Sequence, residues 1–380
     1  MNTRKKLCSI LAVCAVLCLL DACAQQGADV PPEVPEKTHL TENALEHMSA
    51  FDAFAPILDV GPRPGAYVVR DDGTLWSGLY DLCPSGRDDM ENVWGKVLLD
   101  GMPKFLHIGQ WGAAALTEDG IVWSWGDDRF FPLGRDDGEN RGLPGQVMDG
   151  VRQMDMYYDV AAVKEDDTLW VWGGFGIRVP FPEQVMEDVL CTSVTRNDLI
   201  LALKRDGTLW SIEGEPNEDE SAVIYTVREV LNGESGQPLE NVAGLNDNIV
   251  CTEDGSYWAI TGEPDPSTQV KAYPLDEPPA SDIYEVEDFR THVYIDQEGR
   301  LWANAEDHTN ANKYGIYSVD DLTEHFLLDE DVVYANAAEM WIFYIKRDGT
   351  LWLIQGGASE DGSNPFGKPE LVLDHVMLPK

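Results

Sequence analysis

Seven short stretches of the chain share one order of apolar and polar positions. In each, an apolar run precedes an Asp-Gly pair or a close variant of it, and a second apolar run with a tryptophan follows. Aspartate and glycine tolerate the positive φ angles of a tight turn, so each stretch predicts a β-hairpin. The seven stretches are VVRDDGTLWSG at 68–78, LTEDGIVWSWG at 116–126, VKEDDTLWVWG at 163–173, LKRDGTLWSIEG at 203–214, CTEDGSYWAITG at 251–262, IDQEGRLWANA at 295–305 and IKRDGTLWLIQG at 345–356.

The strand that enters each hairpin is apolar at consecutive positions, as in 160–163 and 200–203. The strands of an antiparallel sheet with one solvent-exposed face would alternate apolar and polar residues. A continuous apolar run therefore predicts that both faces of these strands are covered. Sheets that are stacked around an axis, each between two neighbours, meet that demand.

The hairpins recur at a nearly constant interval along the chain. Their tryptophans are Trp76, Trp123, Trp170, Trp210, Trp258, Trp302 and Trp352. An interval of about 40 to 50 residues is typical of propeller blades. A further β-rich run precedes the hairpin, for example at 104–108 and 151–156, and a Pro-x-x-Val run follows it at 144–148 and 182–186. Each repeat thus predicts four strands, and closing the repeats into a ring removes exposed sheet edges.

The stretch from Leu116 to Gly173 resembles the regulator of chromosome condensation (RCC1-like) repeat family, in its bacterial secreted form. The shared motifs, in chain order, are WSWGDD at 123–128, Leu133-Gly134, QVM at 146–148, AAV at 161–163 and DTLW at 167–170. The resemblance implies an all-β fold, a seven-bladed β-propeller of four-stranded antiparallel blades. It also implies a protein-binding platform. Phe131 and Pro132 depart from the family's glycine and glutamine, and the blades after residue 210 lose most of this loop motif.

The N-terminus predicts export. Basic residues at 4–6 precede an apolar run at 7–20, the order of a secretory signal. LDAC at 20–23 resembles the lipobox of bacterial lipoproteins, which implies lipid attachment to Cys23; an ordinary secretory signal is the alternative. We expect a lipoprotein signal peptide at 1–22, a lipidated cysteine and a tether rich in proline and acids at 23–50, and the propeller at 51–380. The protein would sit in the bacterial cell envelope on the extracytoplasmic side, membrane-anchored by lipid only.

Charge and cysteine usage exclude some classes of partner and site. The formal net charge of −41 would repel phosphate backbones, so we expect no nucleic-acid partner. After the signal and Cys23 are set aside, three separated cysteines remain, which argues against a disulfide framework or a zinc knuckle. We expect buried free thiols at Cys83, Cys191 and Cys251.

The repeated tryptophans invite two interpretations. They could form a sugar-binding surface, but a residue that recurs at one position of every repeat is what stacked blades need for packing, so we expect core positions. Ligand binding would then fall to residues that differ between repeats. The aromatic candidates for ligand binding are Trp94, Trp111, Phe130, Phe131, Phe175 and Phe181.

Motifs for catalysis, metals and cofactors are absent from the sequence. It has no GxSxG elbow, no glycine-rich phosphate loop, no HExxH pair and no EF-hand spacing. We therefore expect no cofactor and no metal, and predict an extracellular binding platform for a protein or glycan through variable propeller loops. A carbohydrate-active enzyme, a lyase or hydrolase with acidic residues at the propeller mouth, is the alternative. A structural envelope component is a third interpretation.

Overall fold

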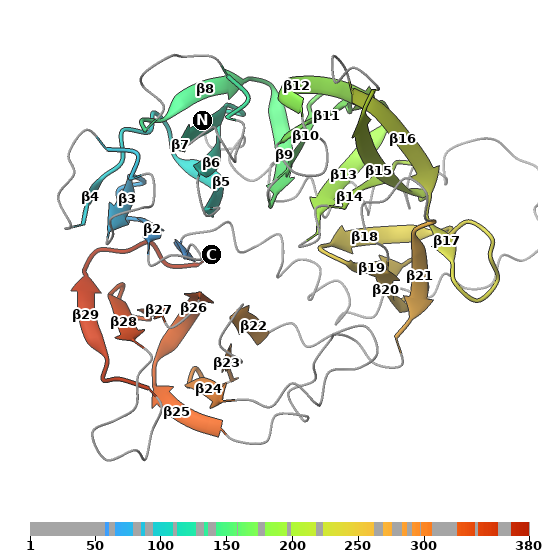
Figure 1. Cartoon of the computed structure of the whole chain (residues 1–380). Coiled ribbons are helices and arrows are strands. Elements are labelled where there is room, and N and C mark those ends of the chain that lie inside the picture. Colours follow the sequence, from blue (N-terminus) through green and yellow to red (C-terminus); the bar gives the residue numbers. More distant parts are fainter. Residues whose placement is uncertain are drawn as a thin grey trace, which may run out of the picture.

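The protein is a ring of seven β-sheets, which follow one another around the ring in chain order (Figure 1). The computed structural model describes residues 58–60, 65–78, 85–87, 94–108, 112–126, 133–135, 142–157, 159–173, 179–195, 199–217, 223–261, 269–275, 283–286, 291–296, 298–305, 325–338, 341–355 and 366–379. We name the sheets blades A to G. The predicted seven-bladed β-propeller of four-stranded antiparallel blades is confirmed.

The first four blades have four antiparallel strands each. Blade A contains β1 (Leu58–Val60), β2 (Ala66–Val69), β3 (Leu75–Gly78) and β4 (Gly95–Lys96); blade B contains β5 (Pro103–Ile108), β6 (Gly112–Thr117), β7 (Val122–Gly126) and β8 (Gly145–Met148). Blade C contains β9 (Val151–Met156), β10 (Asp159–Lys164), β11 (Leu169–Gly173) and β12 (Val179–Met186); blade D contains β13 (Val189–Val194), β14 (Ile200–Lys204), β15 (Leu209–Pro216) and β16 (Val223–Glu229).

Blade E differs from the predicted pattern by one strand. It contains β18 (Val242–Asn246), β19 (Ile249–Thr252), β20 (Tyr257–Thr261) and β21 (Lys271–Pro274), and β17 (Leu231–Asn232) adds to β21 in parallel. Blade F contains β22 (Ile283–Val286), β23 (Thr291–Ile295), β24 (Leu301–Ala305) and β25 (His325–Asp329); blade G contains β26 (Val332–Ala338), β27 (Trp341–Lys346), β28 (Leu351–Gln355) and β29 (Glu370–Leu373).

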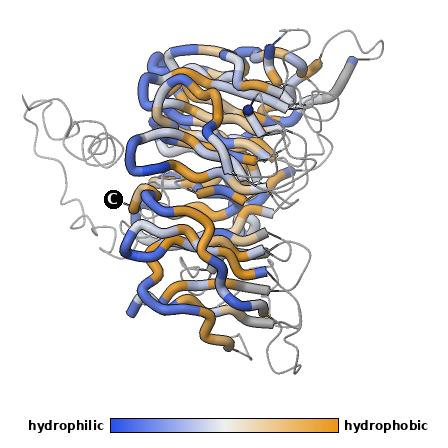
Figure 2. Tube along the Cα trace, turned by 90° about the vertical axis from the view of Figure 1, so that its left-hand side faces the viewer, coloured by the Kyte–Doolittle hydropathy of each residue, from blue (hydrophilic) through white to orange (hydrophobic). Residues whose placement is uncertain are grey.

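The strand order gives the ring two different faces. The tight turn between the second and third strands of every blade lies on one face, which we call the turn face. The connections that follow the first and third strands leave from the opposite face, which we call the loop face. Hydrophilic turns gather along one side of the ring in Figure 2. The second strands are buried along nearly their whole length, as β6 and β10 show, so the prediction from continuous apolar runs is confirmed.

The repeated letters of the hairpins encode one set of hydrogen bonds at the turn. In blade D, the Asp206 carboxylate accepts the backbone N–H of Thr208 at 3.1 Å and its hydroxyl at 2.6 Å. The Thr208 hydroxyl oxygen accepts the indole N–H of Trp210 at 2.9 Å. Blades A, C and G repeat these bonds with Asp72, Asp166 and Asp348 as the carboxylates. The hexapeptide RDGTLW recurs because its aspartate, threonine and tryptophan form this chain of hydrogen bonds.

The repeated tryptophans are half-buried, so the prediction of core positions is correct only in part. Trp76, Trp123, Trp210, Trp258 and Trp352 pack against the apolar clusters between blades. The fully buried indoles are those of Trp125 and Trp172, two residues further along the third strand. Trp125 donates its indole N–H to the Tyr67 hydroxyl of blade A at 2.8 Å. These second tryptophans fill the space between neighbouring blades.

Among the described residues, backbone hydrogen bonds on the turn face join five of the seven pairs of successive blades. The first residue of a first strand donates its N–H to the turn of the preceding blade in four places: Val151 to Gly120, Val189 to Asp167, Val242 to Gly207 and Val332 to Gly299. Val376, near the C-terminus, makes the same bond to Gly349 of blade G at 2.9 Å. It also forms a β-bridge with Arg70 of blade A.

The C-terminal segment therefore completes blade A and closes the ring. β1 is short and pairs only with Ala66–Val68. Val376 takes the position that Val151 or Val189 takes in blades C and D. Asp71 donates its backbone N–H to the carbonyl of His375, and Met377 donates its own to Val69. The first strand of blade A thus combines one piece from each end of the propeller.

Candidate functional site around the propeller axis

Polar residues occupy one register position in the first strand of all seven blades. Each pairs with the residue three positions before the start of the tight turn. We call this set the polar girdle; the pairs are Asp59 with Tyr67, His107 with Ala114, Asp155 with Ala161, Ser193 with Leu201, Asn246 with Ile249, Tyr284 with Val293, and Asn336 with Phe343. The girdle is thus defined by register, as the same position of the first strand in each blade.

Asp59 links three blades through its carboxylate. One oxygen accepts the backbone N–H of Ile108 in blade B at 2.8 Å. The other accepts the backbone N–H of Val60 at 3.0 Å and the side-chain amide of Asn336 in blade G at 3.2 Å. The first and last blades thus meet at this carboxylate. Carboxylates that accept several N–H donors are strong acceptors.

Asp155 makes the same kind of link between blades C and D. One oxygen accepts the hydroxyl of Ser193 at 2.7 Å and the backbone N–H of Val194 at 2.9 Å, and the other accepts the backbone N–H of Met156 at 2.8 Å. The Ser193 hydroxyl oxygen in turn accepts the backbone N–H of Asp247 in blade E at 2.9 Å. One bond therefore recurs around the axis: a girdle side chain accepts the next backbone N–H beyond the girdle in the following blade.

His107 lies in the first strand of blade B, between the blades that carry the two carboxylates. Burial raises the pKa of both Asp59 and Asp155, and attraction to His107 partly opposes this rise for each. Both residues are half-buried, and desolvation of their carboxyls is the larger effect. The ring of His107 is 6.5 Å from that of Tyr157. Two carboxyls of raised pKa near one imidazole form the candidate site.

A neutral clamp lies beside the charged links. The Gln153 side chain in blade C accepts the backbone N–H of Thr192 at 3.0 Å and donates to the Thr192 carbonyl at 2.8 Å. It therefore pairs with the first strand of blade D as a neighbouring β-strand would. Gln153 and Asp155 together bind one stretch of β13, one through an amide and one through a carboxylate.

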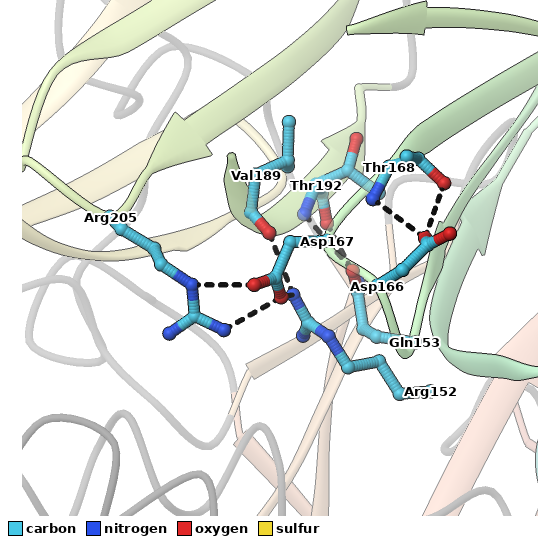
Figure 3. Close-up of polar contacts among 8 residues, drawn as sticks. All are labelled: Arg152, Gln153, Asp166, Asp167, Thr168, Val189, Thr192 and Arg205. Carbon is cyan, nitrogen blue, oxygen red and sulfur yellow. Dashed lines mark hydrogen bonds and ion pairs between the residues drawn. The ribbon is translucent and has the colours of Figure 1, made fainter. Parts of the chain in front are cut away.

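On the turn face, the same pair of blades is joined by an ion cluster (Figure 3). Asp167 stands where most other blades have glycine, and its φ is 66°. Its carboxylate accepts the Arg205 guanidinium of blade D at 2.6 and 2.8 Å and the Arg152 guanidinium at 3.1 Å. The hydrogen bond from Arg205 is the largest influence that lowers the pKa of Asp167.

The site contains no candidate for metal binding. Among the residues that the structure describes, no group of three or more histidine, cysteine, aspartate or glutamate side chains could hold a metal ion. The carboxylate oxygens of Asp59 and Asp155 already accept hydrogen-bond donors from the protein. What the arrangement does chemically is to supply acceptors to backbone N–H groups at the inner edges of the blades.

The aromatic ligand candidates from the sequence lie in different settings. Trp94 is half-buried and its ring makes an edge contact with Phe343 at 6.2 Å, between blades A and G. Phe181 is half exposed on β12. Trp111, Phe130, Phe131 and Phe175 lie outside the described residues, as do residues 1–57 with Cys23. Ligand binding by these aromatics and lipid attachment stay predictions.

Two of the three expected thiols lie within the described residues. Cys251 is buried and free, and burial raises its pKa to about 11, so it behaves as a small apolar side chain. Cys191 is half-buried. Cys83 lies outside the part that the structure describes.

The sequence analysis missed the polar girdle, although a signal was present. Val151, Val189 and Val332 each precede a polar residue by four positions: Asp155, Ser193 and Asn336. Such residues interrupt otherwise apolar runs at a fixed distance from a recurrent valine. Without the register they look like ordinary exposed positions of a strand.

No protein-family model matches the chain, and no curated protein matches it. Among solved structures, Prp20p from Saccharomyces cerevisiae is 14% identical with a TM-score of 0.48, over 90% of this chain and 91% of that chain. A structure of Kap60 bound to yeast RCC1 (Prp20) gives 14% identity and a TM-score of 0.45, over 92% and 90%. Hsv2 of Kluyveromyces lactis gives 11% and 0.39, over 83% and 96%. The seven sheets and their register establish that the chain is a seven-bladed β-propeller.

A search of the described residues for membrane spans found no helix long and apolar enough to cross a bilayer.

Proposed function

We propose that the protein is a binding platform of the cell envelope, which holds a protein or a glycan on its loop face. The observation that supports this best is that the two faces differ in how much their sequences vary from blade to blade. On the turn face, the turns of blades A, C, D and G repeat one set of bonds, which leaves little in this set to distinguish these four blades. Sequence differences between blades are concentrated in connections that leave from the opposite face.

The connections between third and fourth strands differ in length and composition. They run from 79 to 94 in blade A, from 127 to 144 in blade B, from 174 to 178 in blade C and from 306 to 324 in blade F. Specific binding needs such differences, because a partner that contacts one side of the ring must distinguish blades. Regular sheets supply the rigid frame that carries these segments.

The anchoring part of the proposal rests on the sequence. Cys23 would carry the lipid, and residues 23–50 would tether the propeller on the extracytoplasmic side of the membrane. Fractionation of the producing bacterium, with wild type compared with Cys23→Ser, tests this part. Wild type should partition with membranes and the variant should be released; retention of the variant on membranes would contradict lipid attachment at Cys23.

A cross-linking experiment on the full chain tests the binding platform. A photoreactive phenylalanine analogue replaces Phe181, which is half exposed near the start of β12, toward the loop face, and, as a matched control, Asp72 on the turn face. Irradiation of intact cells should give a cross-linked product of defined mass from position 181 and none from the control. Products from position 72 alone would contradict the assignment of the loop face.

The alternative function, a carbohydrate-active enzyme, draws on one specific observation. Asp59 and Asp155 have raised pKa values, as a general acid in glycoside cleavage requires. Their oxygens are occupied by N–H and O–H donors of the protein, which favours a structural role. Incubation of the full chain with envelope polysaccharides decides between the two. Release of new chain ends that Asp155→Asn abolishes would establish catalysis and overturn the platform.

A further inference from the structure

Backbone N–H groups at the inner edges of the blades bond to side chains of the preceding blade, and three of them differ in the charge of their acceptor. Ile108 and Val194 donate to the carboxylates of Asp59 and Asp155 at 2.8 and 2.9 Å. Thr192 donates to the neutral amide oxygen of Gln153 at 3.0 Å. Val194 and Thr192 lie on the same strand, β13. A charged and a neutral acceptor therefore hold one strand only two residues apart.

Both carboxylates are surrounded by donors. Asp59 accepts hydrogen bonds from the backbone N–H groups of Ile108 and Val60 and from the side-chain amide of Asn336. Asp155 accepts them from the backbone N–H groups of Val194 and Met156 and from the hydroxyl of Ser193. A protonated carboxyl loses its negative charge and becomes a weaker acceptor for these donors. Protonation therefore has to break or weaken a bond to a donor, whereas the amide of Gln153 does not titrate.

His107 is the basic group common to both carboxylates, since it attracts each of them. The side-chain amide of Asn336 faces Asp59 from blade G, and the Ser193 hydroxyl faces Asp155 from blade D. Further titratable or charged groups on the elements that pack here are Tyr67, Lys104, Arg152, Tyr157, Asp159, Asp247 and Tyr334.

We propose that Asp59, His107 and Asp155 form a proton-responsive junction, which tightens the inner edges of blades A to D when the carboxylates are charged and loosens them when they are protonated. Burial favours the neutral form of both carboxyls, so they take up protons before the aspartates of the tight turns do. A charged His107 opposes this uptake. The junction lies at the end of the first strands that leads to the loop face.

Amide hydrogen exchange of the full chain, read residue by residue, tests the proposal. The experiment lowers the pH from about 7 to about 4 and corrects for the intrinsic rates of exchange. Protection of Val194 and Ile108 should fall by about tenfold, the difference between a charged and a neutral acceptor. Protection of Thr192 should stay constant, because its acceptor is an amide. A parallel change in all three amides would overturn the proposal, since it would report general loosening.

Two variants separate the roles of the side chains. In Asp155→Asn, the pH dependence of Val194 should disappear while that of Ile108 remains. In His107→Gln, the fall in protection should move to higher pH for both amides, because the attraction to His107 that lowers the pKa of both carboxyls is gone. Unchanged midpoints in His107→Gln would remove the histidine from the junction. If a variant folds poorly, the comparison of Val194 with Thr192 in the wild type still decides the proposal.

The inference stands apart from the proposed function. Amide protection reports the junction itself and needs no partner, so a failure here leaves the loop-face platform untouched. Conversely, a failed cross-linking experiment leaves the junction intact.

Discussion

The carboxylate of Asp167 in blade C accepts two hydrogen bonds from the guanidinium of Arg205 in blade D, at 2.6 and 2.8 Å. Asp167 has a φ of 66°, at a turn position where most blades have glycine. A side chain in the left-handed region costs free energy that glycine avoids. The interblade ion pair offsets this cost, so a departure from the repeat is stabilised by a contact that the other turns lack.

Substitutions at Asp167 should separate the free-energy cost of its left-handed backbone from the contribution of its ion pair with Arg205. Asp167→Ala keeps the strained backbone and loses the ion pair, so we expect a loss of about 1 to 2 kcal/mol in the free energy of unfolding. Asp167→Gly loses the pair but relieves the strain, and should cost about 1 kcal/mol less than alanine. Urea unfolding of both variants measures the difference. Equal losses would show that the backbone at 167 is unstrained.

The two tryptophan positions of the third strands, represented by Trp125 in blade B and Trp210 in blade D, should differ in their contribution to stability. Trp125 is fully buried and bonded to Tyr67, so Trp125→Ala should cost about 3 to 5 kcal/mol. Trp210 is half-buried, and Trp210→Ala should cost about half as much. Thermal and urea unfolding compare the two variants. A larger loss at position 210 would contradict the placement of the core between blades at the second tryptophan.

The C-terminal closure of the ring should be essential for stability. Val376 is buried and joins blades G and A, so Val376→Asp places an unpaired charge in an apolar junction. We expect a loss of about 3 kcal/mol or more. Leu378→Ala is the matched control, because Leu378 is 40% exposed and should change stability by less than about 0.5 kcal/mol. Limited proteolysis with unfolding curves tests both, and a stable Val376→Asp variant would show that the ring closes elsewhere.

Acid should destabilise the protein through the turn of blade F. Burial opposes the charge of Asp296, but hydrogen bonds from the Arg300 backbone, the Trp302 indole and the Arg300 guanidinium outweigh it and lower the pKa of Asp296 to about 2. Because the folded pKa is depressed, this stabilisation is complete above the unfolded pKa near 3.8 and is lost as the pH falls through 2.

The matched variant for this effect is Asp296→Asn. It should lower stability at pH 5 by about 1 to 2 kcal/mol and lose less than the wild type between pH 4 and pH 2. Urea unfolding across this range gives both curves. Parallel curves would assign the acid sensitivity to other carboxylates, such as Asp206, whose hydrogen bonds with Thr208 lower its pKa.

The sequence by itself determined the blades. Each hairpin is stabilised by hydrogen bonds within its own turn. The bonds between Asp206 and Thr208 and between Thr208 and Trp210, for example, join residues two positions apart. Seven such hairpins at a period in the forties leave few folds other than a propeller. These interactions are local, so the hairpins can be predicted from the sequence alone.

Only the tertiary structure decided how the blades are joined. The links from Asp59 to Ile108, Asp155 to Val194, Arg205 to Asp167 and Val376 to Gly349 connect residues that are far apart in the chain or lie on different blades. No periodicity selects Asp59 as a partner of Asn336, because the contact arises only when the ring closes. The polar girdle could not be assigned from the sequence for the same reason: its members share a register in space, whereas along the chain each looks like an ordinary polar position of a strand.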